Sequence, residues 1–93
     1  DVLIRGGEVI DGKQAPRFRA DVGIVGDRIT SIGDLREASA GTVIEAAGRI
    51  VCPGFIDVHN HSDGWLLNQP VFAAKLLQGF TTELLASDGI GYA

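Results

Sequence analysis

The pattern of the sequence changes at Pro53-Gly54, and this change constrains the fold more than any other feature. Before it, short apolar runs are separated by glycine-containing turns, which is typical of β-strands. After it, the residues predict a strand over 55–61, a helix over 69–79 and a strand over 80–87. A strand, a helix and a strand in this order predict a parallel βαβ unit with a right-handed crossover. We therefore expect two parts, residues 1–52 and residues 53–93.

The first part is expected to contain only strands and turns. Residues 1–12 and residues 21–34 each predict a β-hairpin, and residues 43–54 predict two short strands around a turn. The expected turns are Gly6-Gly7, Gly26-Asp27 and Ala47-Gly48.

The second part is expected to begin with a strand and a loop. Residues 61–68 predict the loop, and the following helix has Asn68 as its N-cap, Pro70 in its first turn and Gly79 as its stop. Two parallel strands and one helix leave strand edges and one sheet face uncovered. Additional chain must complete this architecture. We expect the chain alone either to self-associate through the exposed strands or to change conformation beyond about Pro53.

Composition excludes several classes of protein. The 93 residues, 45% of them hydrophobic, suit one small globular unit. Eight basic and twelve acidic residues give a net charge of -4 without a basic cluster, so we expect no binding to nucleic acid or anionic membranes. No stretch approaches the roughly 20 apolar residues needed to span a bilayer. One cysteine cannot form an internal disulfide, which suits a reducing compartment. The sequence opens on Asp1 without a charged and then apolar leader, so we expect a signal peptide to be absent or already removed and the protein to be cytoplasmic.

Both histidines of the chain lie in the predicted strand over 55–61. Alternation along a strand places Asp57, His59 and His61 on one face, and two imidazoles at this spacing can bind one metal ion or a bridged pair. Asp57 lies one layer deeper, where a carboxylate needs a hydrogen bond or a charged partner, such as one from another strand. A His-x-His pair on an exposed strand that binds nothing is the alternative.

The motif PGFIDVHNHSD, residues 53–63, resembles the first-strand motif of the amidohydrolase superfamily of metal-dependent hydrolases. Residues 1–35 and residues 78–93 further resemble the N-acyl-D-amino-acid deacylase branch of that superfamily. The resemblance implies a mixed β and α/β fold. Part of a small β-sandwich would precede the first βαβ unit of a (β/α)8 barrel that is incomplete in this chain.

The resemblance also implies roles for individual residues. His59 and His61 match the family's His-x-His and would bind the more weakly held of one or two divalent ions, zinc in this branch. Asp88 stands where the branch often has a cysteine that binds the tighter zinc. A carboxylate also binds zinc, and the alternative is a turn aspartate. Asp63 would orient a histidine, cap a helix or be solvated, and either of the last two roles is favoured over the first.

The implied activity is hydrolysis of the amide of an N-acyl-D-amino acid by a metal-activated water. The family's other histidine ligands and its catalytic aspartate lie on later barrel strands, so no catalytic residue is expected within these 93 residues. We expect the parent protein to be an enzyme acting on a small molecule and this chain alone to be inactive. The alternatives are a cyclic amidase of the dihydroorotase or hydantoinase type, or a non-catalytic β module with a structural histidine pair.

Overall fold

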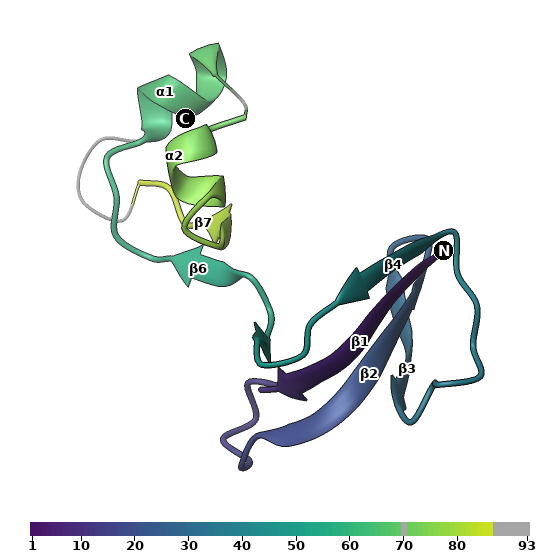
Figure 1. Ribbon diagram of the computed structural model, residues 1–93. Helices are drawn as coiled ribbons and strands as arrows, with labels where there is room; N and C mark the ends of the chain where they lie inside the picture. Colours follow the sequence, from purple (N-terminus) through teal and green to yellow (C-terminus); the bar gives the residue numbers. More distant parts are fainter. Residues whose placement is uncertain (70, 87–93) are drawn as a thin grey trace. The chain divides into compact units, whose positions relative to one another are not determined.

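The computed structural model describes residues 1–69 and 71–86, which form two units (Figure 1). The first unit is Asp1–Pro53 and the second is Gly54–Ala93. Among the described residues, no helix has the length and apolar character that crossing a membrane requires.

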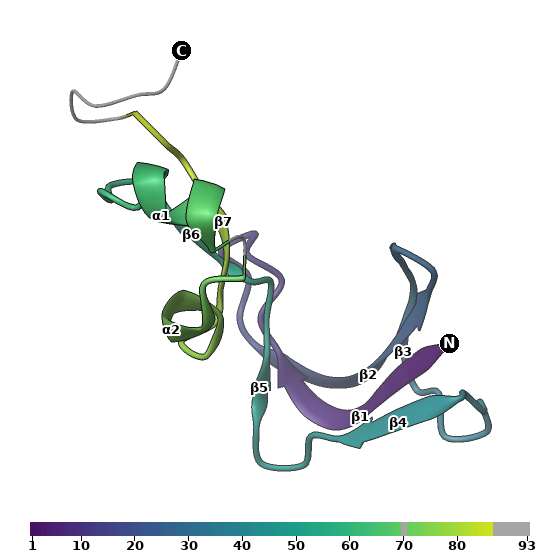
Figure 2. The same cartoon turned by 90° about the horizontal axis from the view of Figure 1, so that it is seen from above.

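The first unit is a five-stranded sheet built around its first strand. Strand β1 lies between β2 on one side and β4 and β5 on the other, and β3 extends the sheet beyond β2 (Figures 1 and 2). Strands β2 and β3 continue the sheet in an antiparallel sense, whereas β4 and β5 run parallel to β1. The strands are β1 (Val2–Val9), β2 (Phe18–Val25), β3 (Arg28–Gly33), β4 (Thr42–Glu45) and β5 (Ile50–Val51).

The turn predicted at Gly6-Gly7 is wrong, because β1 runs through both glycines as a single strand. The pairing of β1 with β2 shifts register between Ile4 and Gly7, which is the mark of a β-bulge. Gly6 has a φ of 67°, and its N–H donates a hydrogen bond of 2.7 Å to Oδ1 of Asp21. The glycine pair therefore bends the strand locally and does not reverse it, since β2 pairs with both halves.

The other two predicted turns are present. Gly26 has a φ of 58° and connects the antiparallel strands β2 and β3, as expected. Gly48, with a φ of 74°, lies between β4 and β5, and both of these short strands exist. They do not pair with each other, because each hydrogen-bonds to a different stretch of β1.

The core of the first unit is small. Leu3, with 2% of its surface exposed, is the largest fully buried side chain. Val9, Ala20 and Val22 form a buried cluster against which half-buried aliphatic side chains pack, namely Ile4, Ile24 and Val51. Several aliphatic side chains of β3 and β4 are exposed. This sheet therefore buries only a few side chains by itself.

Over its described residues, the second unit contains two parallel strands and two short helices. The order of strand, helix and strand agrees with the prediction, although only one helix was expected. Its elements are β6 (Phe55–Asp57), α1 (Asp63–Asn68), α2 (Ala73–Leu76) and β7 (Phe80–Glu83). The ring of Phe55 packs edge-on against that of Phe80, with 5.7 Å between centroids, and ties the starts of the two strands together. The N–H of Leu84 donates to the carbonyl of Asp57 at 2.8 Å and continues the pairing past β7.

Several local predictions in this unit are corrected. Strand β6 ends at Asp57 and does not reach residue 61, because the backbone bends at His59. The predicted loop over 61–68 contains α1, whose first turn forms when the N–H groups of Trp65 and Leu66 bond to the carbonyl of Ser62. Asn68 thus ends α1 and does not cap the next helix.

The predicted helix over 69–79 is shortened to α2, which has Phe72 as its N-cap. Gly79, with a φ of 88°, follows it as the expected stop. The role predicted for Pro70 lies outside the described residues.

Candidate metal centre

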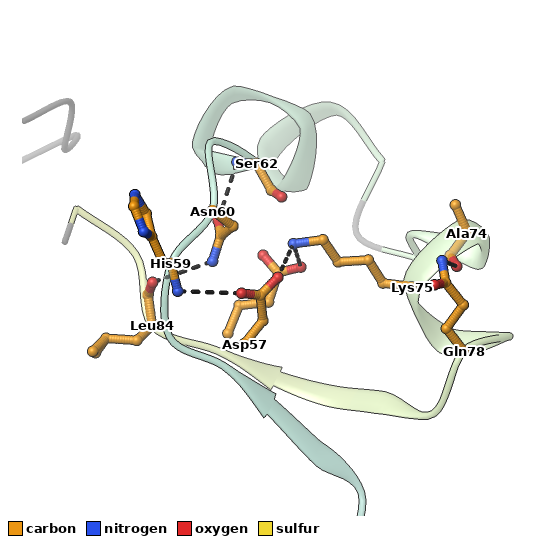
Figure 3. A network of polar contacts seen from close by, with 9 residues as sticks. Asp57, His59, Asn60, Ser62, Ala74, Lys75, Gln78 and Leu84 are labelled. Atoms are coloured by element: carbon orange, nitrogen blue, oxygen red, sulfur yellow. Dashed lines mark hydrogen bonds and ion pairs between the residues drawn. The ribbon is translucent and has the colours of Figure 1, made fainter. Parts of the chain in front are cut away.

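The two histidines lie in an irregular segment, residues 58–62, directly after β6 (Figure 3). Asn60 holds this segment in two ways. Its Nδ2 donates to the carbonyl of Leu84 at 3.3 Å, and its Oδ1 accepts the N–H of Ser62 at 3.1 Å. Because Leu84 follows β7, Asn60 fastens the histidine segment to the same edge at which both parallel strands end.

The imidazoles of His59 and His61 lie next to each other. Their ring centroids are 5.8 Å apart, the ring planes are inclined by 59°, and both residues are exposed. The two rings are neighbours as predicted, but the predicted reason, alternation along a strand, is wrong because β6 ends before either histidine. Two imidazoles bound to one zinc ion through bonds of about 2 Å have centroids roughly 5–6 Å apart. The spacing of the rings therefore fits two ligands of one ion.

Asp57, the last residue of β6, supports this segment with both carboxylate oxygens (Figure 3). Oδ1 accepts the backbone N–H of His59 at 3.2 Å, and Oδ2 accepts a hydrogen bond of 2.7 Å from Nζ of Lys75. The sequence predicted a hydrogen bond or charged partner for this carboxylate. The charged partner comes from helix α2, whereas a strand was the partner suggested.

Lys75 also reaches the neighbouring strand. Its Nζ lies 2.6 Å from Oε1 of Glu83, which pairs with Asp57 in the register of β6 and β7. The side chains of Asp57, Lys75 and Glu83 are 20%, 19% and 11% exposed. Within the described part of the chain, Oε2 of Glu83 is buried without a hydrogen-bond partner. We call these three residues the Lys75 triad.

Asp57 and Lys75 are both charged at neutral pH. The hydrogen bond from Lys75 lowers the pKa of Asp57; burial opposes this shift, and the N–H of His59 adds to it. Burial alone would lower the pKa of Lys75, but the hydrogen bonds to Asp57 and Glu83 outweigh burial and raise that pKa. Two carboxylates around one ammonium leave the triad with a net charge of -1, which favours a cation nearby.

The remaining predicted site residues are less informative. Asp63 is the first residue of α1, and Asp88 lies outside the described residues. Across residues 1–69 and 71–86, no three histidine, cysteine, aspartate or glutamate side chains gather closely enough to hold an ion. This part of the chain thus offers two imidazoles, and a complete ligand set would need further groups.

Lys75 and Glu83 were not predicted from the sequence. Each is a charged residue within an apolar stretch, in AAKLL and FTTELL. A charged side chain at such a position needs a partner of opposite charge. This requirement could have identified Lys75 and Glu83 from the sequence.

No protein-family model matches the chain. Among curated proteins, it is 46% identical to D-aminoacylase and 50% identical to N-acyl-D-glutamate deacylase, both from Alcaligenes xylosoxydans xylosoxydans. Each match includes 100% of this chain and 19% of the relative. The chain therefore spans about a fifth of the length of these relatives.

Solved structures give the same result. A crystal structure of D-aminoacylase, described as defining a subset of amidohydrolases, matches with a TM-score of 0.84 and 49% identity. N-acyl-D-glutamate deacylase from Bordetella bronchiseptica, complexed with zinc and a phosphonate inhibitor, matches with a TM-score of 0.84 and 47% identity. Each match covers 89% of this chain and 18% of the other.

A D-hydantoinase from Thermus sp. matches less closely, with a TM-score of 0.64 and 37% identity, over 89% of this chain and 19% of that one. Identity along the entire chain and agreement of the backbone thus point to one group of proteins. The chain belongs to the amidohydrolase family, in the branch that contains D-aminoacylase and N-acyl-D-glutamate deacylase.

Proposed function

We propose that this chain is part of a zinc-dependent amidohydrolase that cleaves the amide bond of N-acyl-D-amino acids. One observation carries the proposal: the adjacent imidazoles of His59 and His61 follow a parallel strand in a chain whose relatives are deacylases. In parallel barrels, catalytic groups lie at this end of the strands.

His59 and His61 are the proposed zinc ligands, and Asp88 is the proposed third ligand from this chain. The described donors fit the ion, since neutral imidazole nitrogen is a common zinc ligand and the two rings are close enough to share one ion. The zinc complex of N-acyl-D-glutamate deacylase supports the choice of metal. A catalytic zinc site commonly has three protein ligands and one open position, so the parent protein must supply other groups of the site.

The fold proposed for the parent follows from the same relatives. The unit of β6, α2 and β7 would be the first βαβ unit of a (β/α)8 barrel, from residue 53 onwards. The sheet of residues 1–52 would contribute to a small β-sandwich. Exposed apolar side chains support the proposal that the barrel is incomplete in this chain, since Leu67, Val71 and Leu77 are 70% exposed or more. The chain alone would therefore self-associate through apolar surface.

In the reaction, bound zinc lowers the pKa of a water molecule and polarises the scissile carbonyl. In this proposal the residues of this chain bind the ion and position its ligands, and proton transfer is assigned to the remainder of the parent. His59 and His61 hold the ion, Asp57 fixes the backbone of His59, and Asn60 fastens the segment beside β7. The general base that removes the proton of the water would lie in the remainder of the parent, so the chain alone would be inactive.

Opening of a cyclic amide is the second candidate reaction, because a D-hydantoinase shares the backbone. Its lower TM-score of 0.64, against 0.84 for the deacylases, favours the linear N-acyl substrate.

The test uses the full-length parent enzyme. Its zinc content is measured, and hydrolysis of N-acetyl-D-amino acids, N-acetyl-L-amino acids and a hydantoin is compared. We expect bound zinc and hydrolysis of the D-substrates only. His59→Asn and His61→Asn should each lower zinc content and activity, whereas Gln69→Asn, at an exposed position, should change neither. Zinc binding without hydrolysis of any N-acyl amino acid would refute the proposal.

A further inference from the structure

We propose that Lys75 is a positioning residue for the metal centre: its ammonium joins Asp57 to Glu83 and thereby holds the backbone that carries His59 and His61. This inference rests on the proposed function. The ammonium of Lys75 contacts Asp57 and Glu83, so its action would pass through Asp57.

A continuous set of polar contacts links the helix to the histidine segment (Figure 3). Nζ of Lys75 lies 2.7 Å from Oδ2 of Asp57, and Oδ1 of the same carboxylate accepts the N–H of His59 at 3.2 Å. A carboxylate held at one oxygen keeps a fixed direction at the other. The ammonium therefore determines where Asp57 presents its acceptor to His59.

The second contact of Lys75 anchors this arrangement to the neighbouring strand. Nζ lies 2.6 Å from Oε1 of Glu83 in β7, and Asn60 attaches the far side of the histidine segment to Leu84. The segment is thus fastened at two places to the chain around the end of β7.

Burial separates this triad from the other ion pairs described in the chain. Its side chains are at most 20% exposed, whereas those of the pairs Arg17–Glu8, Arg28–Asp27 and Arg36–Asp34 are at least 44% exposed. Exposed pairs are screened by water and salt and hold their side chains loosely. The ammonium of Lys75 is partly buried and is held between two carboxylates. A group held in this way can fix the orientation of a residue beside a metal ligand.

The alternative is that Lys75 only stabilises the connection between β6 and β7. That role predicts a lower stability for Lys75 variants with an unchanged metal centre. Groups that orient metal ligands typically change metal affinity or activity by about 10–100-fold when removed. Metal affinity at matched stability therefore discriminates between the two roles.

The experiment uses the full-length enzyme, with Lys75→Met as the main variant and Lys75→Arg as the conservative one. The readouts are the zinc dissociation constant, the absorption spectrum of the cobalt-substituted protein and amide hydrogen exchange over residues 55–62 in the metal-free protein. We expect Lys75→Met to weaken zinc binding about 10–100-fold, to alter the cobalt spectrum and to speed exchange in this segment. Lys75→Arg should restore part of each effect.

Two controls separate positioning from stability. Lys13→Met removes the other lysine, which is exposed in the first unit, and should leave all three readouts unchanged. Val22→Ala destabilises the buried cluster of the first unit and should lower the melting temperature without changing zinc affinity.

Lys75→Met leaves two carboxylates without their cation, which can prevent folding. The triple variant Asp57→Asn, Lys75→Met and Glu83→Gln removes all three charges and keeps a carbonyl acceptor for the N–H of His59. We expect it to fold and still to bind zinc more weakly than the wild type.

If the wild type is an active zinc enzyme, but zinc affinity and amide hydrogen exchange are unchanged in the triple variant, the inference is overturned and the proposed function stands. A wild-type protein without zinc or deacylase activity would overturn the proposed function, and the inference with it.

Discussion

Replacing Gly7 with alanine is expected to destabilise the first unit because the position has no room for a methyl group. Gly7 is buried in β1 beside β5. A Cβ atom there would lie 2.5 Å from Cγ2 of Val51 and 3.3 Å from Cβ of Ala46. Carbon atoms prefer separations of about 3.5–4.0 Å, so the two strands or the valine must move by roughly 1 Å. Valine has a restricted χ1 angle and gives little relief.

The magnitude follows from two opposing effects. Inserting a methyl group into packed structure costs about 1–3 kcal/mol. Alanine also restricts the unfolded chain, which stabilises the fold by about 0.4–1 kcal/mol where the native φ suits alanine, as it does at Gly7. We therefore expect a net loss of about 1–2 kcal/mol in the free energy of unfolding.

A double-mutant cycle with Val51→Ala tests the cause. Urea unfolding of the four proteins is followed by far-ultraviolet circular dichroism. Val51→Ala removes Cγ2 and leaves Cβ at 3.5 Å from the new methyl group, an ordinary contact. By itself it should cost about 1 kcal/mol, since the side chain is half-buried. In that background Gly7→Ala should cost little, since only the 3.3 Å approach to Cβ of Ala46 stays tight, which gives an interaction energy of about 1–2 kcal/mol.

Gly41→Ala is the matched control, because its nearest neighbour would be the carbonyl oxygen of Asp1 at 3.7 Å. It should not destabilise the protein. The reasoning is refuted if Gly7→Ala has the same effect in the wild-type protein as in the Val51→Ala background, since the clash would then not involve Cγ2.

Two further predictions concern single groups. The N–H groups of Gly6 and Leu35 donate to the carboxylate of Asp21 and hold its pKa below the ordinary 3.8. The stabilisation is thus present above that value and is lost as the pH falls through the lower folded-state pKa. Asp21→Asn should flatten this acid dependence in urea unfolding measured at a series of pH values, and an unchanged slope would contradict it. Gly79→Ala should cost roughly 1–2 kcal/mol, because φ is 88° and the new Cβ would lie 3.4 Å from the Phe55 ring. Gly79→Asn should cost less when both variants are compared by urea unfolding, and equal costs would argue against backbone strain.

Local pattern was sufficient for much of the fold and of the site. The turn at Gly26-Asp27, the stop at Gly79 and the parallel pairing of the last two strands depend on short-range chemistry or on the order of elements. The proximity of His59 and His61 needs only two residues of spacing, and it persists although the strand ends before them. Such features depend on neighbours in the sequence and can be predicted from it.

Other features depended on partners distant in the sequence. Gly6-Gly7 has the composition of a turn, but β2 pairs on both sides of it, so the glycines form a bulge. The helix within 61–68 is a different case, because it begins with local contacts from the N–H groups of Trp65 and Leu66 to the carbonyl of Ser62. Its residues have the composition of a loop, and composition concealed it.

The sequence by itself determined most of the strands, the histidine pair and the need of Asp57 for a partner, because these follow from residue type and spacing. Only the tertiary structure decided that the partner is Lys75, shared with Glu83 from the next strand. The reason is physical. A charge that leaves water accepts whichever opposite charge the folded backbone brings within hydrogen-bonding distance, and that distance is set by the pairing of β6 with β7 and by the position of α2.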